Sequence, residues 1–299
     1  MCGIIGLFLK DRALEPELGK YLSAMLVTMT ARGPDSAGFA VYGDGTRQMT
    51  KVTFRTARDL AIEDLQKMFA TAIGADIEAH RRGTHIVLIV PSEKLDTTLA
   101  QLPTLVPGAQ LSSVGTFMEV YKEVGLPADV SRRFDLAHMS GTHGIGHTRM
   151  ATESAVTTAG AHPFSMGMDQ CLVHNGSLSN HNQVRRRLVH EGLSFMTDND
   201  SEVAAGYLTW RLANGDNLGD ALGASLKELD GFYTFVVGTE TGFGVLRDTI
   251  GCKPAIMAET DQYVAFGTEF RALAVLPGIE NAHVFEPNPA TVYFWDRAQ

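Results

Sequence analysis

Cysteine is scarce in this sequence, with only Cys2, Cys171 and Cys252 among 299 residues. The number is odd and the three positions lie far apart, which argues against a disulfide framework and against a cysteine-rich zinc site. His143 and His147 have the spacing of helical zinc ligands, but glycines surround them and favour a strand or loop. The sequence therefore predicts no metal site.

Long hydrophobic runs and an excess of positive charge are also lacking. The longest apolar run covers about six residues at 86–91, whereas a bilayer-spanning helix needs ~20. Acidic residues number 34 and basic residues 25, which gives a net charge of −9 and disfavours binding to nucleic acid or anionic membrane. The first residues lack the pattern of a secretory signal, so we expect a cytoplasmic protein that binds neither nucleic acid nor membrane.

The overall composition is that of a folded protein, with 44% hydrophobic and 20% charged residues. Short β-prone runs alternate with amphipathic stretches, which predicts an α+β fold of antiparallel sheets covered by helices. Helices are expected at 18–29, 184–188, 203–212 and 218–229. Strands are expected at 3–8, 38–42, 232–237, 244–247, 255–258, 263–266 and 291–295.

Residues from about 55 to 140 differ from the rest of the chain in their pattern of expected helices and strands, which predicts an inserted α/β block. Hydrophobic spacing indicates helices at 60–69, 95–102 and 117–124, and a buried strand at 85–90. No glycine-rich phosphate loop joins a strand to a helix in the chain, so we expect no nucleotide and no other cofactor.

Cys2 is the first candidate for chemistry. Removal of Met1 would give this residue a thiol and a free α-amino group, whose ordinary pKa values are ~8.5 and ~7.7–8. One residue would then supply both nucleophile and base. The alternative is that Cys2 only begins a buried strand.

Arg149 and the pair Asn175-Gly176 each follow a short strand-like segment. An arginine in this place could bind a carboxylate through two parallel hydrogen bonds. The alternative is a solvated arginine on the surface. The Asn175 amide and the Gly176 N–H could form an oxyanion hole, whereas the Asn-Gly dipeptide is also a common turn.

The acidic segment 197–202 leaves three interpretations open. Its alternating carboxylates could form a cation loop, although the EF-hand pattern is not met. Asp200 or Ser201 could cap the helix that follows. Alternatively, one carboxylate could face the ammonium group of a substrate.

Taken together, these segments resemble the class II glutamine amidotransferase domain. The matching segments are, in the family's order, 2–6, 32–38, 147–152, 174–176, 200–202, 247–254 and 267–273. The resemblance implies an N-terminal-nucleophile hydrolase fold, an αββα sandwich, over residues 1–299. Met150 and Pro34 depart from the residues common in the family.

The resemblance also implies roles for individual residues. Cys2 would attack the side-chain amide of glutamine, with Asn175 and Gly176 as the oxyanion hole.

The remaining implied roles concern the amino-acid part of the substrate. Arg149 would bind the α-carboxylate of glutamine and Asp200 its α-ammonium group. Thr152 and His162 would line the pocket.

Segments 113–115 and 122–125 are similar to stand-alone glutaminase subunits of split glutamate synthases, including the N-methylglutamate synthase type. That similarity implies an enzyme that supplies ammonia or glutamyl chemistry to separate flavin and iron–sulfur subunits. Two alternatives stay open, a free-standing amidase for another small amide and a catalytically silent, glutamine-binding regulatory subunit.

Overall fold

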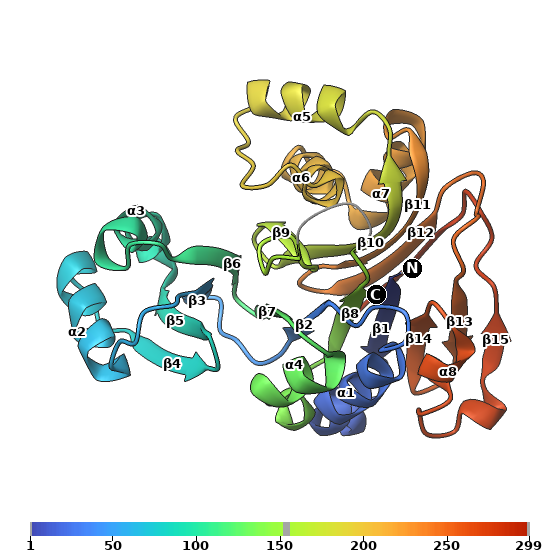
Figure 1. Cartoon of the computed structure of the whole chain (residues 1–299), viewed down its shortest axis with the longest axis horizontal. Helices are drawn as coiled ribbons and strands as arrows, with labels where there is room; N and C mark the ends of the chain where they lie inside the picture. The colour runs from blue at the N-terminus through green and yellow to red at the C-terminus, as the bar shows by residue number, and fades with distance from the viewer. Residues whose placement is uncertain (1, 152–155, 298–299) are drawn as a thin grey trace.

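The computed structural model describes residues 2–151 and 156–297, which form three antiparallel sheets with helices around them (Figure 1). The sheets have seven, five and four strands. Among the described residues, no helix combines the length and the apolar character needed to cross a membrane. Short 3-10 helices lie at Arg12–Glu17, Ser92–Lys94, Leu136–His138 and Ile279–Asn281.

The seven-stranded sheet has β1 at its centre because Gly3–Leu9 is an unbroken buried run. Its strands in spatial order are β15 (His283–Phe285), β13 (Ile256–Glu259), β14 (Tyr263–Gly267), β1 (Gly3–Leu9), β8 (His143–Arg149), β2 (Ser36–Tyr42) and β7 (Met118–Val124). The helices packed on its outer face are α1 (Leu18–Thr28), α4 (Pro127–Arg133) and α8 (Phe270–Leu273).

The five-stranded sheet carries the second set of helices. Its strands in order are β16 (Val292–Asp296), β12 (Gly242–Arg247), β11 (Gly231–Gly238), β10 (Gln170–Leu178) and β9 (Phe164–Gly167). The helices on its outer face are α5 (His181–His190), α6 (Asp200–Ala213) and α7 (Leu218–Glu228).

A separate hydrophobic cluster joins the inner faces of these two sheets. Ile4 and Phe8 of β1 pack in it with Val236 and Phe243 of the smaller sheet. Gly6 lies against the Phe243 ring, where an added Cβ would collide with it, so this glycine allows the sheets to approach closely. The order of layers is therefore helices, sheet, sheet, helices.

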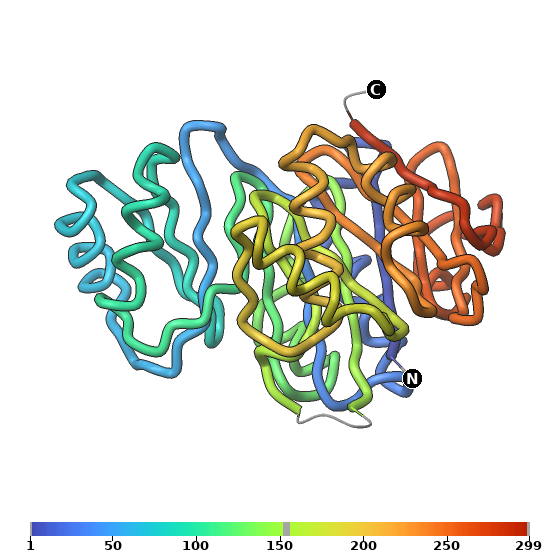
Figure 2. Tube along the Cα trace, turned by 90° about the horizontal axis from the view of Figure 1, so that it is seen from above, coloured from blue at the N-terminus to red at the C-terminus, as the bar shows by residue number. Residues whose placement is uncertain are grey.

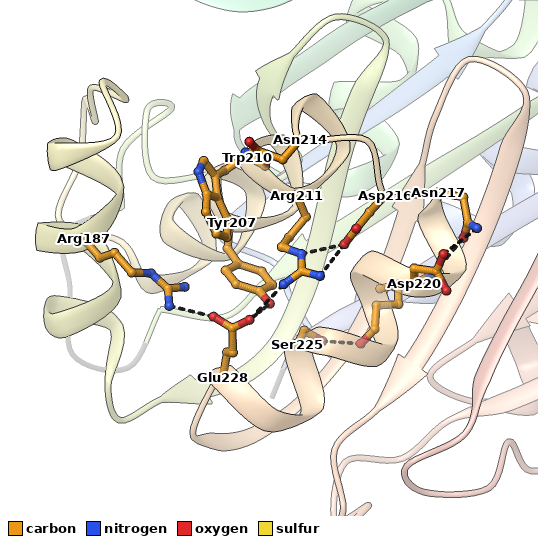
Figure 3. A network of polar contacts seen from close by, with 11 residues as sticks. Arg187, Tyr207, Trp210, Arg211, Asn214, Asp216, Asn217, Asp220, Ser225 and Glu228 are labelled. Carbon is orange, nitrogen blue, oxygen red and sulfur yellow. Dashed lines mark hydrogen bonds and ion pairs between the residues drawn. The ribbon is translucent and has the colours of Figure 1, made fainter.

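A network of polar contacts connects helices α5, α6 and α7 (Figure 3). Glu228 at the end of α7 accepts hydrogen bonds from Tyr207 Oη and Arg211 Nη1 of α6, both at 3.0 Å. Arg187 of α5 forms an ion pair with the same carboxylate at 2.6 Å. The network holds α6, whose first residue is Asp200, against its neighbours.

The four-stranded sheet forms a compact unit beside the two-sheet body (Figures 1 and 2). Its elements in chain order are β3 (Met49–Arg55), α2 (Ile62–Ile73), β4 (Glu78–Arg82), β5 (His85–Pro91), α3 (Leu95–Leu105) and β6 (Gln110–Gly115). The strand order β4-β5-β3-β6 is that of a split βαββαβ unit. It has a hydrophobic core of its own under α2 and α3. We propose Met49–Gly115 as the bounds of the inserted block, in place of about 55–140.

The helix predicted at 117–124 is wrong, because this segment is strand β7 of the main sheet. Its apolar residues also fit helical spacing, and so short a segment gives little basis for choosing between the two periods. The structure decides through pairing, with Phe39 of β2 opposite Tyr121. Helix α4, whose residues fall within the predicted bounds of about 55–140, packs on the main sheet.

Candidate active site

A pocket of about 210 Å³ opens where β1 begins, β8 ends and β10 passes. Three residues predicted from the sequence to act together, Cys2, Asn175 and Gly176, line it. Its complete lining is Cys2, Arg32, Met150, Asn175, Gly176, Lys253 and Pro254.

The backbone of Cys2 is held from two sides. Its carbonyl oxygen accepts hydrogen bonds from Arg32 Nε and from Asn175 Nδ2, each at 3.1 Å. Arg32 is itself fixed by an ion pair of 2.5 Å with Glu269. Neither Arg32 nor Glu269 had an assigned role from the sequence, since 237 residues separate the two in the chain.

Replacing Arg32 with methionine is expected to lower the turnover of the proposed substrate, glutamine, by about 10- to 100-fold, because small displacements of a nucleophile are costly. Arg271 offers a matched control, since it binds the other oxygen of Glu269 at 2.6 Å and does not line the pocket. Arg271→Met should change turnover little. Equal losses in the two variants would contradict a specific role for Arg32.

His147 sets the ionisation of the Cys2 thiol. Burial acts to raise the pKa of Cys2, but the hydrogen bond and the charge of His147 are the largest of the opposing effects, and the pKa falls from 9.0 to about 7. A large fraction of the thiol is therefore thiolate at neutral pH, which is the reactive form. From the sequence, His147 was a weighed and disfavoured zinc ligand and the first residue of the matching segment 147–152, without a role of its own in the site. The alternation of side chains along a strand could have linked His147 to the site, since His147 and Arg149 lie two residues apart in β8 and therefore share a face of the sheet.

Alkylation of Cys2 by iodoacetamide provides a test of this pKa. The rate is expected to rise with pH and to reach half its maximum near pH 7, because the thiolate is the attacking form. Mass spectrometry of the N-terminal peptide measures the rate, with Cys2→Ala as the background for the other cysteines. A midpoint near pH 9 would contradict the assigned effect of His147.

Asn175 and Gly176 lie inside strand β10, opposite Thr234 and Tyr233 of β11, so the turn interpretation is wrong. Gly176 has φ 145°, and a Cβ there would collide with the carbonyl oxygen of Phe232. Glycine is thus required by both the backbone angle and the close approach of β11.

Arg149 and His162 lie near the pocket but are not part of its lining. Arg149 is buried, so the surface alternative is wrong. Its guanidinium lies against Gly160, where an added Cβ would come within 3.3 Å. The His162 ring stacks on that of His147 with centroids 4.1 Å apart. The predicted site residue Thr152 falls outside the described residues.

Asp200 begins α6, but it is not the cap, because the Asn199 side chain accepts from Ser201 N at 2.8 Å. The Asp200 carboxylate accepts from Leu178 N at 2.9 Å, and its other oxygen lies 3.9 Å from His174 Nδ1. Asp200 thus adjoins β10 just beyond the pocket lining.

The cation-loop interpretation of segment 197–202 is not supported. The Glu202 carboxylate is already used by Met196 N, Thr197 N and Thr197 Oγ1. No group of three or more histidine, cysteine, aspartate or glutamate residues within 2–151 and 156–297 could hold a metal ion.

Lys122 of β7 is a buried cation to which the sequence assigned no role in the site. Its Nζ donates to the carbonyls of Ala159, Ala161 and Pro163 at 3.3, 2.8 and 3.3 Å. Burial lowers the pKa of Lys122 to about 8. The side chain thereby ties down the segment that carries His162.

Lys122→Met is expected to lower the free energy of unfolding by about 2–3 kcal/mol, because three carbonyls lose a charged donor. Chemical denaturation measures the change. Lys20→Met removes an exposed ion pair with Glu17 and should leave stability nearly unchanged. Similar losses in the two variants would contradict this account.

The comparisons with known proteins point to one family. A profile described as glutamine amidotransferase domain matches residues 134–294. The chain is 59% identical over 297 residues to the glutamine amidotransferase-like protein GlxB of Rhizobium meliloti (strain 1021), covering 99% of this chain and 98% of that protein. This chain belongs to the glutamine amidotransferase family. The family is one of enzymes, and the resemblance predicted from the sequence is confirmed at this level.

Two further relatives extend the comparison. A putative glutamine amidotransferase of Methanothermobacter thermautotrophicus is 32% identical over 305 residues, covering 98% of this chain and 99% of that one. The solved structure of the glutamine PRPP amidotransferase from B. subtilis has a TM-score of 0.63 at 19% identity. The alignment covers 99% of this amidotransferase chain but only 48% of that longer one, and it shows a shared mixed α/β fold.

Proposed function

We propose that this glutamine amidotransferase hydrolyses the side-chain amide of glutamine through a thioester on Cys2. The observation that carries the proposal is the placement of a thiol with a lowered pKa in one pocket with an asparagine amide and a glycine backbone. The four layers of the two-sheet body fit the N-terminal-nucleophile αββα sandwich, which would use the α-amino group of Cys2 as the base.

The proposed reaction begins with attack of the Cys2 thiolate on the amide carbon. Asn175 Nδ2 and the Gly176 N–H donate to the oxyanion that forms. The C–N bond then breaks, the nitrogen takes up the proton held by the α-amino group, and ammonia leaves. Water hydrolyses the remaining γ-glutamyl thioester, which gives glutamate and the free thiol.

The amino-acid end of glutamine is assigned to the residues around the pocket. The buried guanidinium of Arg149 is the proposed partner of the α-carboxylate, and Asp200 that of the α-ammonium group. The resemblance also assigns Thr152 and His162 to the binding of glutamine. An amide screen tests it, because glutamine should be preferred over amides that lack either charged group.

The destination proposed for the ammonia is a separate synthase subunit of glutamate synthase or N-methylglutamate synthase type, with flavin and iron–sulfur groups on the partner. The support is the sequence similarity at 113–115 and 122–125, and a reducing cytoplasm suits three free cysteines. The test is purification of the native complex and a glutaminase assay with and without it. Absence of a synthase-like subunit would refute the partner, and absence of glutamate release in both assays would refute the activity.

A further inference from the structure

The Asn175 amide is held at both of its ends. Its Nδ2 donates to the carbonyl oxygen of Cys2 at 3.1 Å, and its Oδ1 lies 3.2 Å from His147 Nε2. His147 belongs to β8 of the seven-stranded sheet and Asn175 to β10 of the five-stranded sheet. One contact between side chains thus bridges the two sheets beside the pocket.

The two ends of the amide are not equivalent, because only one of them can donate. The Cys2 carbonyl is purely an acceptor, so it must face the NH₂ group of Asn175. The amide oxygen then faces His147, and an oxygen needs a donor. It follows that His147 Nε2 carries a hydrogen in the working enzyme.

His147 is itself fixed, as this role requires. The residue is 1% exposed, and its ring stacks on that of His162, which in turn meets Phe164 edge to face. The ring therefore has little freedom to turn away from the Asn175 oxygen.

We infer that His147 is a positioning residue that fixes which end of the Asn175 amide faces the pocket. It anchors Oδ1, so that the second hydrogen of Nδ2 points to the place where the oxyanion forms. The inference rests on the proposed function and deepens it, since it adds a residue to the site that acts through Asn175.

The tautomer of His147 tests the inference without any substrate. In ¹⁵N NMR spectra of the matured protein, recorded at a pH at which the His147 ring is neutral, the signals are expected to show a protonated Nε2 and a bare Nδ1. A bare Nε2 would make the nitrogen an acceptor and would overturn the inference, whether or not the chain turns over glutamine. The absence of turnover in the wild-type chain, alone and with its complex, would instead refute the proposed function.

A double-mutant cycle provides the kinetic test, with kcat taken at the high-pH plateau of each variant so that the separate effect of His147 on the pKa of Cys2 does not enter. His147→Phe keeps the buried ring but removes the donor, and kcat is expected to fall about 10²-fold with KM for glutamine little changed. In the Asn175→Ala background the same change should cost less than about tenfold, because the residue it acts through is gone. A further loss of tenfold or more in that background would overturn the inference.

Two variants guard against a loss of folding. His147→Gln can place an amide donor near the position of Nε2 and is expected to restore at least about tenfold of the activity lost in His147→Phe. Failure of this rescue in a folded variant would also count against the inference. His143→Phe introduces the same ring in β8, where His143 stacks on Tyr42, and should leave kcat unchanged.

Discussion

Replacing Cys2 with alanine is expected to lower the release of glutamate from glutamine by about 10⁴-fold or more, because no thioester can form without the thiol. The loss should appear in kcat, and folding should be largely intact, since Cys2 precedes β1 and is only half-buried. Glutamate is measured in matured protein whose loss of Met1 has been verified by intact mass.

The other two cysteines provide controls for this result. Cys171 is fully buried, burial raises its pKa to about 12, and it lies beside Tyr42 away from the pocket. Cys252 is exposed. Cys252→Ala should retain full activity and Cys171→Ala most of it. Turnover that persists in Cys2→Ala would show that the proposed mechanism is wrong.

Replacing Asn175 with alanine is expected to lower kcat by about 10²–10³-fold, which is the typical cost of one oxyanion donor. KM for glutamine should change little, because the donor matters chiefly once negative charge develops on the amide oxygen. Steady-state kinetics with thermal unfolding of the same sample separates this effect from misfolding.

Asn175→Asp serves as the matched variant, since it keeps the shape and removes the NH₂ donor. It should be at least as impaired as the alanine variant, because a carboxylate repels the developing charge. Asn217→Ala removes a helix cap at the start of α7 and should leave kcat unchanged. Near-normal activity in Asn175→Asp would contradict the role assigned to the amide.

The sequence predicted those parts of the site in which a residue type carries its own chemical meaning. Cys2 and the pair Asn175-Gly176 each suggested a reaction step and line one pocket, whereas Arg149, which suggested carboxylate binding, lies outside that lining. The order of the motifs suggested the family. The strands and helices predicted outside residues 55–140 also match elements of the structure, because their hydrophobic spacing or turn signals are clear, whereas β9, β15 and α8 were not predicted.

The residues that were missed act through partners that are distant in the chain. Arg32 reaches Glu269, and Lys122 reaches carbonyls about 40 residues away. His147 acts on Asn175 across two sheets. Such contacts depend on tertiary packing, which the spacing of hydrophobic residues along the chain does not reveal. The same limitation explains the error at β7, where pairing with β2 overrides an ambiguous period.

Labelling of the matured protein with a diazoketone analogue of glutamine identifies the nucleophile. The analogue reacts with a nucleophilic thiol, loses nitrogen and leaves a covalent adduct that peptide mass spectrometry locates. One adduct is expected, on Cys2, and excess glutamine should prevent its formation. Protein that lacks Met1 and stays unlabelled at Cys2 would contradict this expectation.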